Sequence, residues 1–157
     1  MTDLTKEEME AILFAHGKSE LEFDADGTMT TVVPKPHYEI AVLDLAIDGW
    51  DAVYEMYRRL LSGNRGRNIQ FQPRTDGVGR NTLFSEAYIS FDTSAGKRVT
   101  GLYMVVVEFD PELKKVIGER MYTDQIFGQM WAENIGKDFP DLPGVSRIRD
   151  GAPIVGG

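Results

Sequence analysis

The pattern of apolar and polar positions predicts long strands in the C-terminal half of the chain. Asn81 to Asp92 alternates with a period of two, and Val99 to Phe109 is rich in β-branched and aromatic residues. Both patterns are typical of strands. Asp110-Pro111-Glu112 predicts a turn, after which Lys114 to Tyr122 returns as a partner strand. Because Val99 to Phe109 is apolar on both faces, we expect the rest of the chain to cover both sides of this pair.

A further strand is expected just before this meander. Arg65 to Arg74 alternates around Ile69 and Phe71, and Pro73 marks the end of the strand or an edge of the sheet. Asp76 to Gly79 is expected to form the turn into the next strand.

The N-terminal half carries helix signals. Thr5 and Glu8 have the spacing of a capping box, and the apolar residues that follow predict a helix from Leu4 to His16. Gly17 is a plausible residue after the helix end, and Ser19 with Glu22 predicts that the chain resumes as a short helix.

Two later helices are predicted in the same way. Asp48 is expected to cap a helix that ends at Gly63. Its apolar stripe consists of Trp50, Val53, Tyr54, Tyr57, Leu60 and Leu61. Gln125 to Asn134 predicts a last helix, with Gly136 as its terminator.

Residues 20–33 allow two interpretations. Asp26-Gly27 suits a hairpin turn between strand-favouring residues, whereas Asp24 could cap a helix from Ala25 to Val33. Pro34-Lys35-Pro36 breaks either element. His37 to Val42 is then expected to be a strand, and Leu45 to Ile47 a second short strand.

Composition excludes several classes of partner and site. The formal net charge of −8 over 157 residues gives no general attraction to phosphate backbones, so we expect neither nucleic acid nor an anionic membrane surface as a partner. With no cysteine and two histidines, we expect no metal site and no cofactor. We find no apolar leader and no apolar run of membrane-spanning length, and expect a cytoplasmic protein.

Three stretches carry a resemblance to a known family. They are Asp24 to Ile40 (DADGTMTTVVPKPHYEI), Gly49 to Leu61 (GWDAVYEMYRRLL) and Gly118 to Asp124 (GERMYTD). They resemble, in turn, a capped helix with a Pro-containing break and a strand, a Gly-x-x-Ala-Val helix, and a last strand leading into a helix. These features are similar to the nuclear transport factor 2-like superfamily, in its SnoaL-like (polyketide cyclase-related) branch.

The resemblance implies a fold class and an architecture. The class is α+β, with a cone-shaped, curved antiparallel sheet wrapped around N-terminal helices, also described as a cystatin-like α+β barrel. It makes residues 25–33 helical rather than a hairpin. We expect a single SnoaL-like domain over residues 1–157, with its core at about 10–136 and an irregular extension over 137–157. The resemblance also implies a pocket in the open end of the cone and a homodimer formed through the outer face of the sheet.

The expected activity is binding of a small apolar molecule, with proton-transfer chemistry on a ring-containing substrate. The reaction would be an isomerisation, dehydration or cyclisation, and the alternative is a non-catalytic ligand-binding protein or a dimerisation domain. Asp124 matches the carboxyl after the last strand of the family and is the candidate base, although an Asp at this position can equally cap the following helix.

Two further polar candidates and a set of pocket residues complete the prediction. Tyr38 could donate its phenol to an oxyanion. Glu86 could face the cavity or the outside, because alternation defines two faces without saying which is inside. The residues expected to line the pocket are Trp50, Tyr54, Tyr57, Tyr88, Met104, Phe127 and Trp131.

Overall fold

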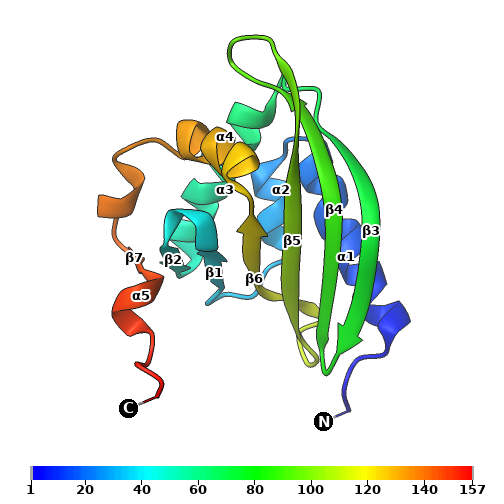
Figure 1. Cartoon of the computed structure of the whole chain (residues 1–157). Helices are drawn as coiled ribbons and strands as arrows, with labels where there is room; N and C mark the ends of the chain where they lie inside the picture. The colour runs from blue at the N-terminus through cyan, green and yellow to red at the C-terminus, as the bar shows by residue number, and fades with distance from the viewer. Residues whose placement is uncertain (1, 157) are drawn as a thin grey trace.

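The structure, a computed structural model that describes residues 2–156, is built on a curved seven-stranded sheet with helices behind it (Figure 1). The strand order is β3-β4-β5-β6-β1-β2-β7, so β3 and β7 are the two ends of an open sheet. The strands are β1 (His37–Ile40), β2 (Leu45–Asp48), β3 (Gln70–Gly79), β4 (Thr82–Asp92), β5 (Arg98–Asp110), β6 (Lys115–Thr123) and β7 (Val145–Arg147). The predicted α+β class with a curved sheet is confirmed.

The helices are α1 (Lys6–Leu21), α2 (Ala25–Thr30), α3 (Trp50–Asn64), α4 (Gln125–Ile135) and α5 (Ile148–Gly151), with 3-10 turns η1 (Ala41–Leu43) and η2 (Phe139–Asp141). The predicted capping box is present, because Thr5 Oγ1 accepts from Glu8 N at 3.2 Å and Glu8 Oε2 accepts from Thr5 N at 3.0 Å. The prediction that Gly17 ends this helix is wrong. Helix α1 runs through it to Leu21, and the left-handed residue that follows is Phe23 at φ 57°.

The segment that allowed two interpretations is helical. Asp24 caps α2 by accepting from Gly27 N at 2.9 Å, and the hairpin alternative is wrong. The helix is shorter than predicted because Val32 already forms a parallel bridge with Val116 on β6.

Strand β3 lies further along the chain than predicted. The predicted strand from Arg65 to Arg74 begins only at Gln70, and the predicted turn at Asp76–Gly79 is part of the strand. A β-bulge between Pro73 and Thr75 accommodates the proline. The strand continues through Gly77 because the Phe84 ring covers this position, where a Cβ would collide with it.

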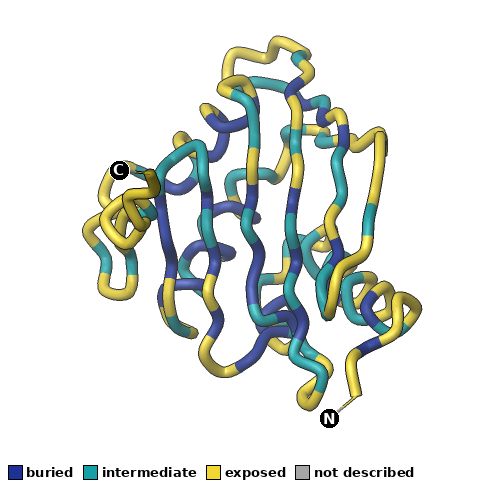
Figure 2. The backbone as a smooth tube through the Cα atoms, turned by 60° about the horizontal axis from the view of Figure 1, so that its bottom comes forward, coloured by how far each residue is buried: buried dark blue, intermediate teal, exposed yellow. Residues whose placement is uncertain are grey.

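The sheet has a helix-facing side and an outer side. Buried residues alternate with exposed ones along β4 and β5, and Figure 2 shows this alternation along the strands. The helix-facing set comprises Leu83, Ala87, Ile89, Phe91, Val105, Val107 and Phe109. The outer set includes Phe84, Tyr88, Leu102, Met104 and Tyr122, each at least 36% exposed. Residues of β4 and β5 at the positions between these buried residues therefore point away from the helices and cannot reach the interior.

The tail is more ordered than the predicted irregular extension. Strand β7 pairs antiparallel with β2, joining Leu45 to Arg147 and Ile47 to Val145. The tail therefore extends the edge of the sheet. Among the residues that the structure describes, no helix has the length and apolar character needed to cross a membrane.

Candidate functional site

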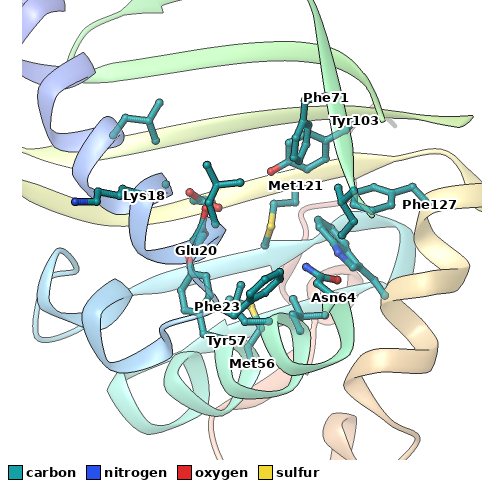
Figure 3. A pocket seen from close by; sticks show the side chains of 18 of the residues that line it. Lys18, Glu20, Phe23, Met56, Tyr57, Asn64, Phe71, Tyr103, Met121 and Phe127 are labelled. Atoms are coloured by element: carbon teal, nitrogen blue, oxygen red, sulfur yellow. The ribbon is translucent and has the colours of Figure 1, made fainter. Parts of the chain in front are cut away.

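A large cavity lies between helices α1, α3 and α4 and the inner side of the sheet (Figure 3). Its volume is about 860 Å³, within the usual range for small-molecule sites. Its aromatic lining consists of Phe14, Phe23, Tyr57, Phe71, Tyr103, Phe127 and Trp131. Half of the other lining residues are Leu, Ile or Met, so the cavity favours an apolar, ring-sized ligand.

One wall of this cavity, called the polar wall below, carries Glu20 and Glu119, with the buried His16 in contact with both. His16 on α1 is 0% exposed, and Glu119 on β6 is 6% exposed. The His16 Nε2 atom lies 3.3 Å from Glu119 Oε1 and 3.4 Å from Glu20 Oε1. It also lies 2.9 Å from the Tyr57 hydroxyl oxygen. Glu20 and Glu119 both line the cavity.

The hydrogen bonds around His16 determine where its protons are. The Thr31 hydroxyl donates to the Thr28 carbonyl at 2.6 Å. It can therefore only accept from His16 Nδ1, which lies 2.6 Å away. The Nδ1 atom consequently carries a hydrogen.

The second ring nitrogen is also protonated. The Tyr57 hydroxyl donates to the Tyr38 hydroxyl at 3.1 Å, so its oxygen accepts from His16 Nε2. A ring that donates from both nitrogens is an imidazolium. Burial alone would lower the pKa of His16, but the charges and hydrogen bonds of Glu20 and Glu119 outweigh burial and raise it to about 10.

The groups facing this imidazolium have shifted pKa values as well. Burial raises the pKa of Glu119, the hydrogen bond with His16 opposes that rise, and the charge of Glu20 adds to it, so the net direction is upward. Burial and the Glu119 charge raise the pKa of Tyr103. Tyr103 extends from β5 with its hydroxyl pointing toward the cavity (Figure 3), so the phenol stays protonated and can donate to a ligand.

His16, Glu20 and Glu119 could also be considered as metal ligands. Each offers one ligand atom, and these atoms lie within 4.8 Å of one another. The hydrogen bond from Nε2 to Tyr57 gives that nitrogen a partner without a metal ion. A metal would have to replace that proton.

The structure places the three predicted catalytic residues in three different surroundings. Asp124 is the N-cap of α4, with Oδ1 accepting from Phe127 N at 3.0 Å, and it is not among the residues that line the cavity. Tyr38 is fully buried behind Tyr57 and contacts its hydroxyl. Glu86 lies on the outer side of the sheet, 3.4 Å from Arg74 Nε.

The predicted pocket lining divides into two groups. Tyr57, Phe127 and Trp131 line the cavity. Tyr88 and Met104 lie on the outer side of the sheet, because each follows and precedes an inward-facing residue of its strand. Trp50, at the start of α3, is 40% exposed. Tyr54 is half-buried outside the lining.

Sequence reasoning missed the polar wall for two reasons. His16 and Glu20 have the i, i+4 spacing of neighbours on a helix face, but Gly17 was interpreted as the helix end. Glu119 lies in a strand whose alternation does not say which side faces inward. The register shift opposite Glu108 and Phe109 lets both Val116 and Glu119 face inward, although they are an odd number of residues apart.

No protein-family model and no curated protein matches the sequence. Solved structures do match. The epoxide hydrolase/cyclase-like enzyme SalBIII, from pyran ring formation in the polyether salinomycin, has a TM-score of 0.64 and 14% identity, with 77% of this chain and 94% of that chain covered. A putative SnoaL-like polyketide cyclase from Jannaschia sp. CCS1 has a TM-score of 0.61 and 12% identity, covering 82% and 95%.

An NTF2-like protein from Burkholderia xenovorans LB400 has a TM-score of 0.61 and 10% identity, covering 84% of this chain and 98% of that chain. At these identities the likeness establishes the fold. The predicted NTF2-like fold, in the form seen in SnoaL-like proteins, is confirmed.

Proposed function

We propose that this chain, which has the NTF2-like fold of SnoaL-like proteins, binds a small apolar ring-containing molecule and catalyses proton transfer on it without a cofactor. The reaction would be an isomerisation, a dehydration or a cyclisation. The observation that carries this proposal is a buried carboxyl, Glu119, held beside a fixed imidazolium in a large aromatic cavity. Such a carboxyl can act as a base, because burial raises its pKa and therefore its basicity, while the hydrogen bond with His16 favours the ionised form.

Each polar group of the wall has a role in this mechanism. Glu119 removes a proton from the carbon next to an electron-withdrawing group of the ligand. Glu20 stands nearer the mouth, with its side chain 32% exposed, and can exchange protons with solvent. The Tyr103 hydroxyl donates to the oxygen on which negative charge develops.

His16 acts through position and charge. Thr31 and Tyr57 hold both ring nitrogens, and the imidazolium fixes the Glu119 carboxylate against the cavity. Tyr38 supports Tyr57 from behind. We assign the base to Glu119 rather than Asp124 because the Asp124 carboxylate caps α4 and lies outside the lining.

A base probe tests this proposal. 5-Nitrobenzisoxazole is a small neutral aromatic whose ring opens when a base removes its C–H proton, which gives a coloured phenolate. We expect the wild-type protein to accelerate this reaction and Glu119→Gln to lower the rate at least about 100-fold. The matched control is Glu112→Gln in the exposed turn between β5 and β6, which removes the same charge far from the cavity.

Binding is measured separately, with the fluorescence of neutral N-phenyl-1-naphthylamine. Binding without any acceleration of the probe reaction would support the alternative of a non-catalytic ligand-binding protein. This alternative is favoured by the ion pair itself, since His16 already engages Glu119. Equal rates for the wild type and Glu119→Gln would show that Glu119 is not the base.

A homodimer is part of the same proposal. The outer side of the sheet exposes Tyr88, Leu102, Met104 and Tyr122, and contiguous exposed apolar groups of this kind mark contact surfaces. We expect sedimentation to give a dimer mass and Leu102→Lys to give a monomer that retains ligand binding.

A further inference from the structure

The polar wall of the cavity carries more negative than positive charge. Two carboxylates, Glu20 and Glu119, line the cavity. Within residues 2–156, the cation in contact with them is the His16 imidazolium. When both carboxyls are ionised, the wall has a formal charge of −1, and both carboxylates share a single Nε2–H that also faces Tyr57.

The other cations nearby are at the mouth. The stem of Lys18 borders the cavity, but its amine points away from the centre (Figure 3). Arg65 lies over the outer part of Phe23, with its guanidinium carbon 5.0 Å from the ring centroid. Both side chains are exposed, so water screens their charges, whereas the buried carboxylate is screened much less.

The aromatic side chains of the cavity also favour a positively charged ligand. Tyr103, Phe127 and Trp131 form a mutually packed group, with centroid distances of 4.7 to 5.8 Å. The faces of aromatic rings carry negative charge density and attract cations, particularly where water is excluded. A cavity that combines aromatic walls with unbalanced carboxylates is complementary to an organic cation.

We propose that the ligand of this cavity is a ring-containing organic cation, an ammonium or iminium whose positive nitrogen faces Glu20 and Glu119 from the cavity, across from His16. This inference rests on the proposed small-molecule site and specifies its ligand class. The rings of the ligand lie against the aromatic side chains, and its nitrogen supplies the charge that His16 leaves unbalanced. An anionic ligand would bring its charge to two carboxylates and is excluded.

The test compares two probes of the same shape. Phenyltrimethylammonium and tert-butylbenzene differ in one central atom, nitrogen or carbon, and therefore in charge. Displacement of N-phenyl-1-naphthylamine measures the affinity of each, at physiological ionic strength, with benzenesulfonate as the anionic probe. We expect the cation to bind at least about 10-fold more tightly than the neutral isostere, and benzenesulfonate to bind most weakly.

Variants test whether the carboxylates of the polar wall cause the preference for the cationic probe. Glu20→Gln removes the half-exposed carboxylate without emptying the core, and it should reduce the cation-to-neutral ratio at least about 3-fold. Glu119→Gln should do the same, whereas Glu112→Gln changes the net charge equally and should leave the ratio unchanged. A ratio that falls equally in Glu112→Gln would attribute the preference to the overall charge of −8 and overturn the proposal.

The outcomes separate this inference from the function on which it rests. Equal binding of the two isosteres, together with catalysis of the probe reaction, overturns the cation class and leaves the proposed function intact. Failure of every aromatic probe to bind overturns both. Preferential binding of benzenesulfonate overturns the charge assignment, whatever the catalytic result.

Discussion

Replacing Thr31 by valine should lower the pKa of His16 in the folded protein. The Thr31 hydroxyl accepts from His16 Nδ1 at 2.6 Å and donates to the Thr28 carbonyl at the same distance. Valine has nearly the same volume and removes both bonds without creating a cavity. The Thr28 carbonyl retains the Thr31 backbone N–H as a donor at 3.1 Å. The main loss is therefore the hydrogen bond to the imidazolium.

The size of the effect follows from that single bond. A hydrogen bond to a charged group contributes about 1.5–3 kcal/mol, and one pKa unit corresponds to about 1.4 kcal/mol. The pKa of His16, raised to about 10 in the native protein, should fall by roughly 1–2 units. Stability at neutral pH should fall by about the energy of that bond.

The assay is an NMR titration of histidine ring carbons. The chain has two histidines, and His37→Asn assigns the remaining signal to His16. Thr31→Ser keeps the hydroxyl and should titrate like the native protein. An unchanged His16 pKa in Thr31→Val, or an equal shift in Thr31→Ser, would refute the proton arrangement derived for this site.

Three further results are expected. The pKa of His16 is about 10 in the folded protein and ordinarily 6.5, so the stabilisation that the charged ring provides is complete below pH 6.5 and is lost as pH rises toward 10. The urea midpoint of unfolding should therefore fall across this window. A midpoint that does not change with pH would contradict the imidazolium. Asp124→Ala should cost about 1 kcal/mol of stability by removing the helix cap, whereas Asp124→Asn should leave stability nearly unchanged. Both variants should retain the probe reaction. Loss of that reaction in a stable Asp124→Asn protein would restore Asp124 as a base. Gly118→Ala should cost more than about 3 kcal/mol, because its Cβ would collide with the His37 carbonyl oxygen; thermal melting measures the loss, and a melting temperature near the native one would show that the backbone yields there.

The sequence predicts the fold where local pattern and tertiary packing agree. The alternation in β4 and the apolar run of β5 specify strands by themselves. Helix α1 was divided in two because Gly17 has no intrinsic preference to continue a helix, while burial of Met9 and His16 stabilises the whole element. Strand β3 was displaced because the pairing of Gly77 with Phe84 is visible only once β4 lies beside it.

The candidate site was less predictable than the fold. Glu119 reaches the cavity through a register shift that sequence alternation does not reveal. His16 becomes an imidazolium only when residues from α1, the end of α2, α3 and β6 meet. Tyr57, Phe127 and Trp131 were predictable as lining residues because they lie on the apolar faces of amphipathic helices.

The parallel pairing of β1 with β6 has a consequence for folding kinetics. It joins Glu39 to Arg120 and Ile40 to Met121, so the N-terminal half of the chain docks onto the strand that carries Glu119 through a contact spanning about half the chain. Pairings of such sequence separation are slow to form, because a long loop must close before the contact stabilises it. We expect the hairpins of β3, β4, β5 and β6 to form first during refolding, before β1 pairs with β6. In stopped-flow experiments, the capacity to bind N-phenyl-1-naphthylamine should then lag behind the circular-dichroism signal of the sheet.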